Sequence, residues 1–292
     1  MNFFEKILAG LNGQMETPTS YGWFHLMFLF FTILGCVLLA MLAIKNRDNE
    51  EKAKKTTRIV VLTYGIVVIL LEIYKQLNFS YNPSTDTWHY QWYAFPFQFC
   101  STPMYVALVA GCLKGGKFQE WLYSYLATFA LFGGICVMLY PNDVFIGTIG
   151  INIQTMICHG GMVVMGVYLL ASGLVKLKFT TIFKAMAIFA GLSLIAIILN
   201  IIYHATGGTA TFNMFFISPY LPCTLPILSL VFSSVPYPIF LVVYILGFSF
   251  AGFLMLSIAI LFDRFIKNEI ARREVFEDDK AFKIIMRAIK ED

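Results

Sequence analysis

Seven apolar stretches, almost free of charge, dominate the 292-residue chain. They lie at residues 22–44, 59–73, 94–113, 121–140, 150–174, 183–202 and 239–262. A helix needs roughly 20 apolar residues to cross the hydrocarbon of a bilayer. Only 13% of the residues are charged, about half the proportion found in soluble domains. We therefore predict an all-α fold, a polytopic membrane bundle of about seven transmembrane helices, with no nucleic-acid partner.

The basic residues between these stretches predict the orientation of the chain. All but two of the 21 lysines and arginines fall in the first, third and fifth loops or after the last stretch. Loops rich in lysine and arginine stay in the cytoplasm, so we expect the N-terminus outside and the C-terminus inside. We divide the chain into a transmembrane domain, residues 1–266, and a cytoplasmic tail, residues 267–292. The tail has apolar residues near helical spacing, which predicts an amphipathic helix.

Residues 211–235 are apolar but are broken by Pro219, Pro222 and Pro226. If this segment crossed the bilayer, the basic tail would move outside, against the positive-inside rule. We therefore expect either a re-entrant segment, tolerated only where protein buries it, or a segment that lies on the surface.

Strongly polar residues are rare in the apolar stretches, and such residues are usually paired or functional. Under the predicted orientation, they all fall in the outer half or the middle of the bilayer. They are Glu72 and Lys75 in the second stretch, Gln98, Cys100 and Ser101 in the third, His159 in the fifth, Asn200 and His204 in the sixth, and Asn213 in the loop that follows. Their common depth predicts an outward-facing polar cavity.

Several of these residues also have a purely structural interpretation. Glu72 and Lys75 are three apart on one helical face, where they can form an ion pair. Asn200 and His204 are four apart, and amides commonly hydrogen-bond between helices. His159 needs a hydrogen-bond partner at its depth, and packing alone could provide one.

Cys100 is a candidate nucleophile. Pro96 suits the first turn of a helix, which would place Cys100 near a helix N-terminus. Free amide groups and the helix dipole stabilise a thiolate there. The other five cysteines are interpreted as buried free thiols. The cysteine spacings do not match a zinc site, so we expect neither a metal nor another cofactor.

Three places in the sequence resemble the YwaF-like integral membrane proteins of bacteria. Residues 96–101 resemble the family's proline–aliphatic–histidine–aliphatic–cysteine–serine motif, and His159 resembles its histidine in the fifth helix. Asn213, Pro222 and the pair Pro236-Tyr237 resemble its asparagine-aromatic stretch and proline-rich re-entry. Where the family has a histidine two residues before the cysteine, this chain has Gln98, which can hydrogen-bond but cannot accept a proton. The resemblance implies a bacterial cell membrane.

The YwaF-like proteins are related to eukaryotic multi-pass membrane acyltransferases that remodel ether phospholipids. The resemblance implies a lipid-modifying acyltransferase whose partners are phospholipids or lysophospholipids. Cys100 would be the nucleophile and His159 the general base and then acid, while Gln98 or Asn213 would donate to the oxyanion. The alternatives are a non-enzymatic lipid-binding carrier or small-solute transporter, whose polar residues line a cavity, and a receptor, suggested only by the helix count.

Overall fold

The structure is a computed structural model that describes the backbone of residues 2–291 and the side chains of residues 2–265 and 268. Within these residues the chain is nearly all helical, and six helices are long and apolar enough to cross a membrane. They are α2 (Trp23–Asn46), α3 (Glu50–Ser80), the run Lys117–Leu139, α7 (Ile149–Ala171), α8 (Thr181–Ala205) and the part of α10 up to Phe265. The polytopic helical bundle predicted from the sequence is confirmed. Its orientation in the membrane stays a prediction.

The run Lys117–Leu139 is one membrane-length helix with a local irregularity. It consists of α5 (Lys117–Tyr125), a π-helical turn η2 (Leu126–Ala130) and α6 (Leu131–Leu139). All five residues of η2 are buried. π-Helical turns of this kind are common at functional sites, and this one lies in the centre of the bundle, against α7, α8 and α10.

The third apolar stretch, residues 94–113, contains Pro96 and Pro103 and is only partly helical. A 3₁₀ turn η1 (Trp92–Ala94) leads into an irregular stretch, residues 95–101, and only Thr102–Cys112 forms a helix, α4. Pro103 lies in the first turn of α4, where a missing N–H is tolerated, whereas Pro96 lies before the helix. At about 1.5 Å per residue, α4 is about 16 Å long, roughly half the hydrocarbon thickness.

The irregular stretch and α4 nevertheless carry the chain back along α3. Arg58, near the start of α3, donates its Nε–H to the Gly111 carbonyl at the end of α4, at 3.1 Å. Small residues allow the close approach of these two helices: a Cβ on Gly65 would lie 2.9 Å from Leu108, and one on Gly111 would clash with Leu62. Six helices are therefore long enough to span a membrane, and the irregular stretch with α4 forms a further, shorter segment that packs along α3.

Helix α7 lies in the middle of the bundle and contacts α2, α3, α6 and η2. Two adjacent glycines let two of these neighbours approach. A Cβ on Gly160 would lie 2.5 Å from the Thr32 hydroxyl of α2, and one on Gly161 would lie 2.8 Å from the Tyr64 ring of α3. The two glycines that follow His159 therefore serve close contacts between helices.

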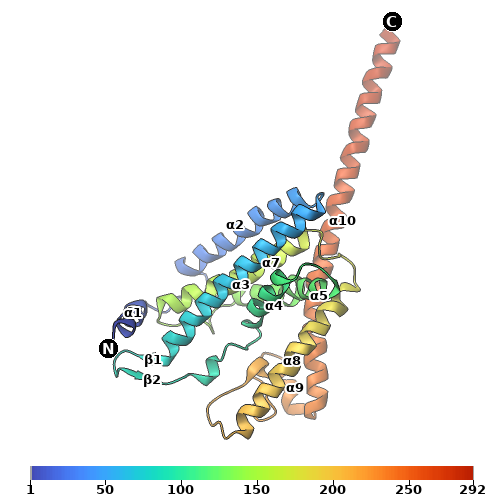
Figure 1. Cartoon of the computed structure of the whole chain (residues 1–292). Coiled ribbons are helices and arrows are strands. Elements are labelled where there is room, and N and C mark those ends of the chain that lie inside the picture. The colour runs from blue at the N-terminus through green and yellow to red at the C-terminus, as the bar shows by residue number, and fades with distance from the viewer. Residues whose placement is uncertain (1, 292) are drawn as a thin grey trace.

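The N-terminal end of the bundle carries a small extramembrane structure. Helix α1 (Phe3–Leu11) begins with a capping box between Asn2 and Glu5. It lies near a hairpin of β1 (Tyr81–Asn82) and β2 (Thr87–Trp88) (Figure 1). Phe4 of α1 stacks on Trp88 of β2 with the ring centroids 6.4 Å apart. The apolar residues of α1 are largely exposed, as suits a helix at the membrane interface.

The proline-broken segment, residues 211–235, lies between α8 and α10 at one end of the bundle and does not cross it (Figure 1). Its first half packs into the bundle, and we call it the re-entrant segment: most of residues 212–218 are buried, with a 3₁₀ turn η3 (Met214–Phe216) among them. The Phe215 ring packs against Phe97, Phe99 and Phe189. Its second half forms α9 (Leu228–Ser234), which has no buried residue. The depth of each half in the membrane stays a prediction.

Helix α10 (Tyr237–Glu291) continues from the last membrane span into the predicted tail as a single helix, which leaves the bundle in a nearly straight line (Figure 1). The side chains of the tail lie outside the described residues, apart from Asn268. Its predicted amphipathic character therefore stays a prediction.

Candidate functional site

Three polar side chains gather on one face of α3, and we call Glu72, Lys75 and Gln76 the α3 polar cluster. Glu72 Oε1 accepts from Lys75 Nζ at 2.7 Å and from Gln76 Nε2 at 2.7 Å. Gln76 Nε2 also donates to the Ala94 carbonyl at 2.7 Å, which ties the cluster to the irregular stretch. The Glu72 and Lys75 side chains are only 6% and 17% exposed. The ion pair follows the predicted spacing; Gln76 was missed, although it lies four residues from Glu72.

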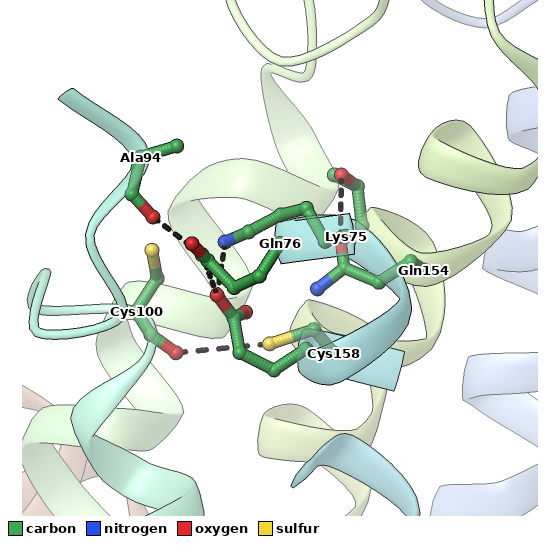
Figure 2. A network of polar contacts seen from close by, with 8 residues as sticks. Lys75, Gln76, Ala94, Cys100, Gln154 and Cys158 are labelled. Atoms are coloured by element: carbon green, nitrogen blue, oxygen red, sulfur yellow. Dashed lines mark hydrogen bonds and ion pairs between the residues drawn. The ribbon is translucent and has the colours of Figure 1, made fainter. Parts of the chain in front are cut away.

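Cys100 lies at the entry to α4, directly before the N-cap residue Ser101. Its sulfur lies within electrostatic range of both Lys75 and Glu72. Figure 2 shows the Cys100 thiol turned toward Ala94 and Gln76. Cys100 therefore lies near a helix N-terminus, as predicted. The helix is α4, which begins at Thr102, and not a helix whose first turn contains Pro96.

Helix α7 meets Cys100 through the residue that precedes His159. Cys158 Sγ donates to the Cys100 carbonyl at 3.7 Å (Figure 2). His159 is 5% exposed, and its Nδ1 is 2.8 Å from the Thr155 carbonyl. Because a carbonyl only accepts, Nδ1 carries the proton of the neutral ring and Nε2 keeps its lone pair. That Nε2 atom is buried and has no hydrogen-bond partner within the described residues.

Tyr64 of α3 is a neighbour that the sequence analysis did not single out. Its hydroxyl is buried and finds no hydrogen-bond partner among the described side chains and backbone. It lies within electrostatic range of Cys158 and Cys100. The sequence feature that could have identified it is a tyrosine in the middle of an apolar stretch. Two helices therefore contribute neighbours of the irregular stretch. Helix α3 contributes Tyr64 and the α3 polar cluster, and α7 contributes Cys158.

Gln98 and Asn200 hold the re-entrant segment in place. Gln98 Nε2 donates to the Asn213 carbonyl and its Oε1 accepts from the Phe215 N–H, both at 3.1 Å. Asn200 is fully buried; it accepts from the Met214 N–H at 2.8 Å and donates to the Met214 carbonyl at 3.0 Å. Each amide therefore satisfies both backbone polar groups that it faces.

Asn213 acts in the same way within the segment itself. Its Nδ2 donates to the Pro222 carbonyl at 3.0 Å and its Oδ1 accepts from the Ser218 N–H at 2.9 Å. The turn between these residues is strained, because Phe215 and Phe216 have φ angles of 59° and 58°. A non-glycine residue in this region costs on the order of 1–3 kcal/mol. The amide contacts hold this strained turn against the bundle.

His204 is set apart from both groups. Its ring lies against Tyr220, with the centroids 4.8 Å apart, and its buried Nε2 has no partner among the described residues. Asn200, four residues earlier, serves the re-entrant segment instead. The spacing of four therefore places these two residues near one end of α8 without joining them in one site.

The end of the bundle that is predicted to face outward contains a cavity of about 540 Å³, which is lined by residues of α1 and of the hairpin region. Its polar lining includes Asn12, Gln14, His89 and Gln91, and none of the residues predicted from the sequence to form a site. No group of three His, Cys, Asp or Glu side chains suited to a metal ion occurs in the part of the chain whose side chains are described.

Comparison with known proteins places the chain in a family. No curated protein and no solved structure matches it. The model of the TMEM164 family matches residues 20–260, which include five of the six long helices, most of the span in α10 and all of the candidate residues discussed above. The chain is therefore a multi-pass membrane protein that belongs to the TMEM164 family.

Proposed function

We propose that this protein is a membrane acyltransferase that uses Cys100 as its nucleophile and acts on phospholipids. The observation that carries the proposal is the contact between the Cys100 backbone and the α7 turn that bears His159. His159 follows Cys158 by one residue, about 100° around the helix. Its ring is already in the tautomer that a base needs, with Nε2 unprotonated and unpartnered.

The chemistry runs in two balanced half-reactions. In the first, His159 Nε2 takes the Cys100 proton, the sulfur attacks the ester carbonyl of a donor phospholipid, and an acyl-thioester forms. The imidazolium then gives its proton to the departing oxygen, which leaves as a lysophospholipid. In the second, His159 takes the proton of a lysophospholipid hydroxyl, which attacks the thioester. The thiolate that leaves recovers its proton from His159.

One other residue of the site supports this chemistry. Gln98 uses one N–H on the Asn213 carbonyl, and the second N–H of its amide is the one proposed to donate to the oxyanion. The resemblance to YwaF-like proteins adds the proposal that this reaction takes place at the plasma membrane of a bacterium.

A second candidate function is a lipid-binding carrier or small-solute transporter. The observation that favours it is the buried Glu72–Lys75 ion pair, because ionisable pairs at membrane depth often mark a transport pathway. Under this proposal, Cys100 is a small apolar residue and needs no activated thiol.

The test is acyl transfer by the purified full-length protein in nanodiscs that contain phosphatidylethanolamine with a labelled acyl chain and unlabelled lysophosphatidylcholine. Cys100→Ala and His159→Gln should each abolish formation of newly labelled phosphatidylcholine. Cys136→Ala, which changes an exposed cysteine of α6, should leave it unchanged. Wild-type protein should also carry label that neutral hydroxylamine removes, as expected of a thioester. Transfer that persists in Cys100→Ala would refute the nucleophile, and lipid exchange without transfer would favour the carrier.

A further inference from the structure

A second cavity, independent of the Cys100 site, lies at the opposite end of the bundle. It has a volume of about 780 Å³, within the usual range of ligand sites. It is formed where the ends of α2, α3, α5 and α7 meet, on the side predicted to be cytoplasmic. Six basic residues line it: Arg47, Lys54, Lys55, Arg58, Lys114 and Lys176.

The acidic residues of the lining do not neutralise this charge. Three acidic residues face six basic ones, and two of the three are already paired: Glu50 with Lys54 at 2.5 Å, and Glu120 with Lys184 from outside the cavity at 2.9 Å. Glu51 is the third. The cavity is therefore positive overall.

Several of its cations remain available to a ligand. Lys55, Lys114 and Lys176 form no ion pair with any described side chain. Arg58 donates its Nε–H to the Gly111 carbonyl, which fixes the guanidinium and leaves its two terminal nitrogens for another partner. A fixed, partly buried guanidinium among mobile lysines is well suited to the oxygens of a phosphate.

The backbone adds positive character at the same place. Gly115 and Gly116 line the cavity with φ angles of 125° and 101°, and a Cβ at either position would meet open space. Gly116 is the N-cap of α5, and no side chain caps the helix there. The first N–H groups of α5 and the helix dipole therefore favour an anion beside the lysines.

We propose that this cavity binds a phosphate group, carried either by a soluble anion or by the headgroup of an anionic lipid. The positive-inside rule requires basic residues on this side of the membrane, but it does not require them to converge. Lys45 and Lys178 lie on the same side and do not line the cavity. This difference gives a matched comparison of converging and dispersed charges.

The experiment compares the double variant Lys114→Gln/Lys176→Gln with the control Lys45→Gln/Lys178→Gln. All four lysines are exposed, and both variants remove two positive charges from the same side of the protein. Native mass spectrometry of the full-length protein in detergent measures binding of dioleoyl phosphatidate, with dioleoyl phosphatidylcholine as the zwitterionic reference. Thermal unfolding with and without inorganic phosphate, at constant ionic strength, measures the soluble anion.

Because each lysine near an anionic headgroup contributes about 1 kcal/mol, or roughly fivefold in affinity, the cavity variant should bind its ligand at least about tenfold more weakly than wild type. The control should change by less than about twofold. If the cavity variant loses only the binding of phosphatidate, the site belongs to a lipid headgroup. If it loses the thermal stabilisation by inorganic phosphate, the site belongs to a soluble anion. If both variants weaken binding equally, or neither does, the proposal is wrong.

Discussion

Breaking the Glu72–Lys75 ion pair of α3 should be among the most destabilising single changes in the molecule. The two charged atoms lie 2.7 Å apart with side chains 6% and 17% exposed. At an effective dielectric constant of about 20, the attraction at this distance is about 6 kcal/mol before desolvation is subtracted. Removal of one partner leaves the other charge buried and uncompensated, which typically costs about 3–5 kcal/mol. We expect Lys75→Met or Glu72→Gln alone to lower the free energy of unfolding by that amount.

The double variant Glu72→Gln/Lys75→Met should recover most of the loss, because it leaves no unpaired charge. The assay is a double-mutant cycle on the purified protein in mixed micelles, with unfolding followed by SDS titration and circular dichroism. The pair Glu50–Lys54 gives the control, since its side chains are 77% and 58% exposed and its ions are 2.5 Å apart. Its coupling energy should be much smaller than that of the Glu72–Lys75 pair, because water screens an exposed ion pair. If the Glu72 and Lys75 losses simply add, the proposed coupling does not exist.

Two further changes test how the helices and the re-entrant segment are held. Asn200→Ala should cost about 1–3 kcal/mol in the same unfolding assay, because it leaves the buried Met214 N–H without a partner and its carbonyl with only the bond from the Ile217 N–H; a loss below about 0.5 kcal/mol would contradict this role. Gly111→Ala should destabilise the α3–α4 contact, since its Cβ would clash with Leu62. Gly191→Ala in α8 meets open space and should raise the stability by about 0.4–1 kcal/mol. Equal effects of these two glycine changes would argue against the close α3–α4 packing.

Most of the membrane-spanning fold could be predicted from the sequence, because the hydrocarbon imposes both the length and the composition of a spanning helix. The ends of the helices were less predictable. Helix α3 begins at Glu50, nine residues before the apolar stretch, because Asn49 caps a polar first turn with its side chain on the Lys52 N–H. Hydropathy marks where a helix enters the lipid, and capping residues mark where it begins.

The irregular stretch at residues 95–101 could not be predicted, although the prolines that break it are visible in the sequence. A helix break within a membrane needs other partners for its backbone, and a proline does not reveal them. Here Gln98 joins the stretch to a segment more than 110 residues later. Likewise, the spacing of Glu72 and Lys75 predicted their ion pair, whereas only the folded chain brings the Cys100 carbonyl to Cys158.

Hydrogen bonding separates the polar residues that the fold explains from those that it does not. Gln98, Asn200 and Asn213 each bond backbone groups of the re-entrant segment through both amide atoms, so its strained turn is a sufficient reason for their polarity. A buried polar atom without a partner costs about 1–3 kcal/mol, and five such side chains occur among the described residues: Asn46, Tyr64, His159, Ser193 and His204. Of these, Tyr64 lies within electrostatic range of Cys100, and His159 directly follows Cys158, whose Sγ contacts the Cys100 carbonyl. A fold selected for stability alone would replace them with apolar residues, so their unpartnered atoms are where we expect a substrate to bind.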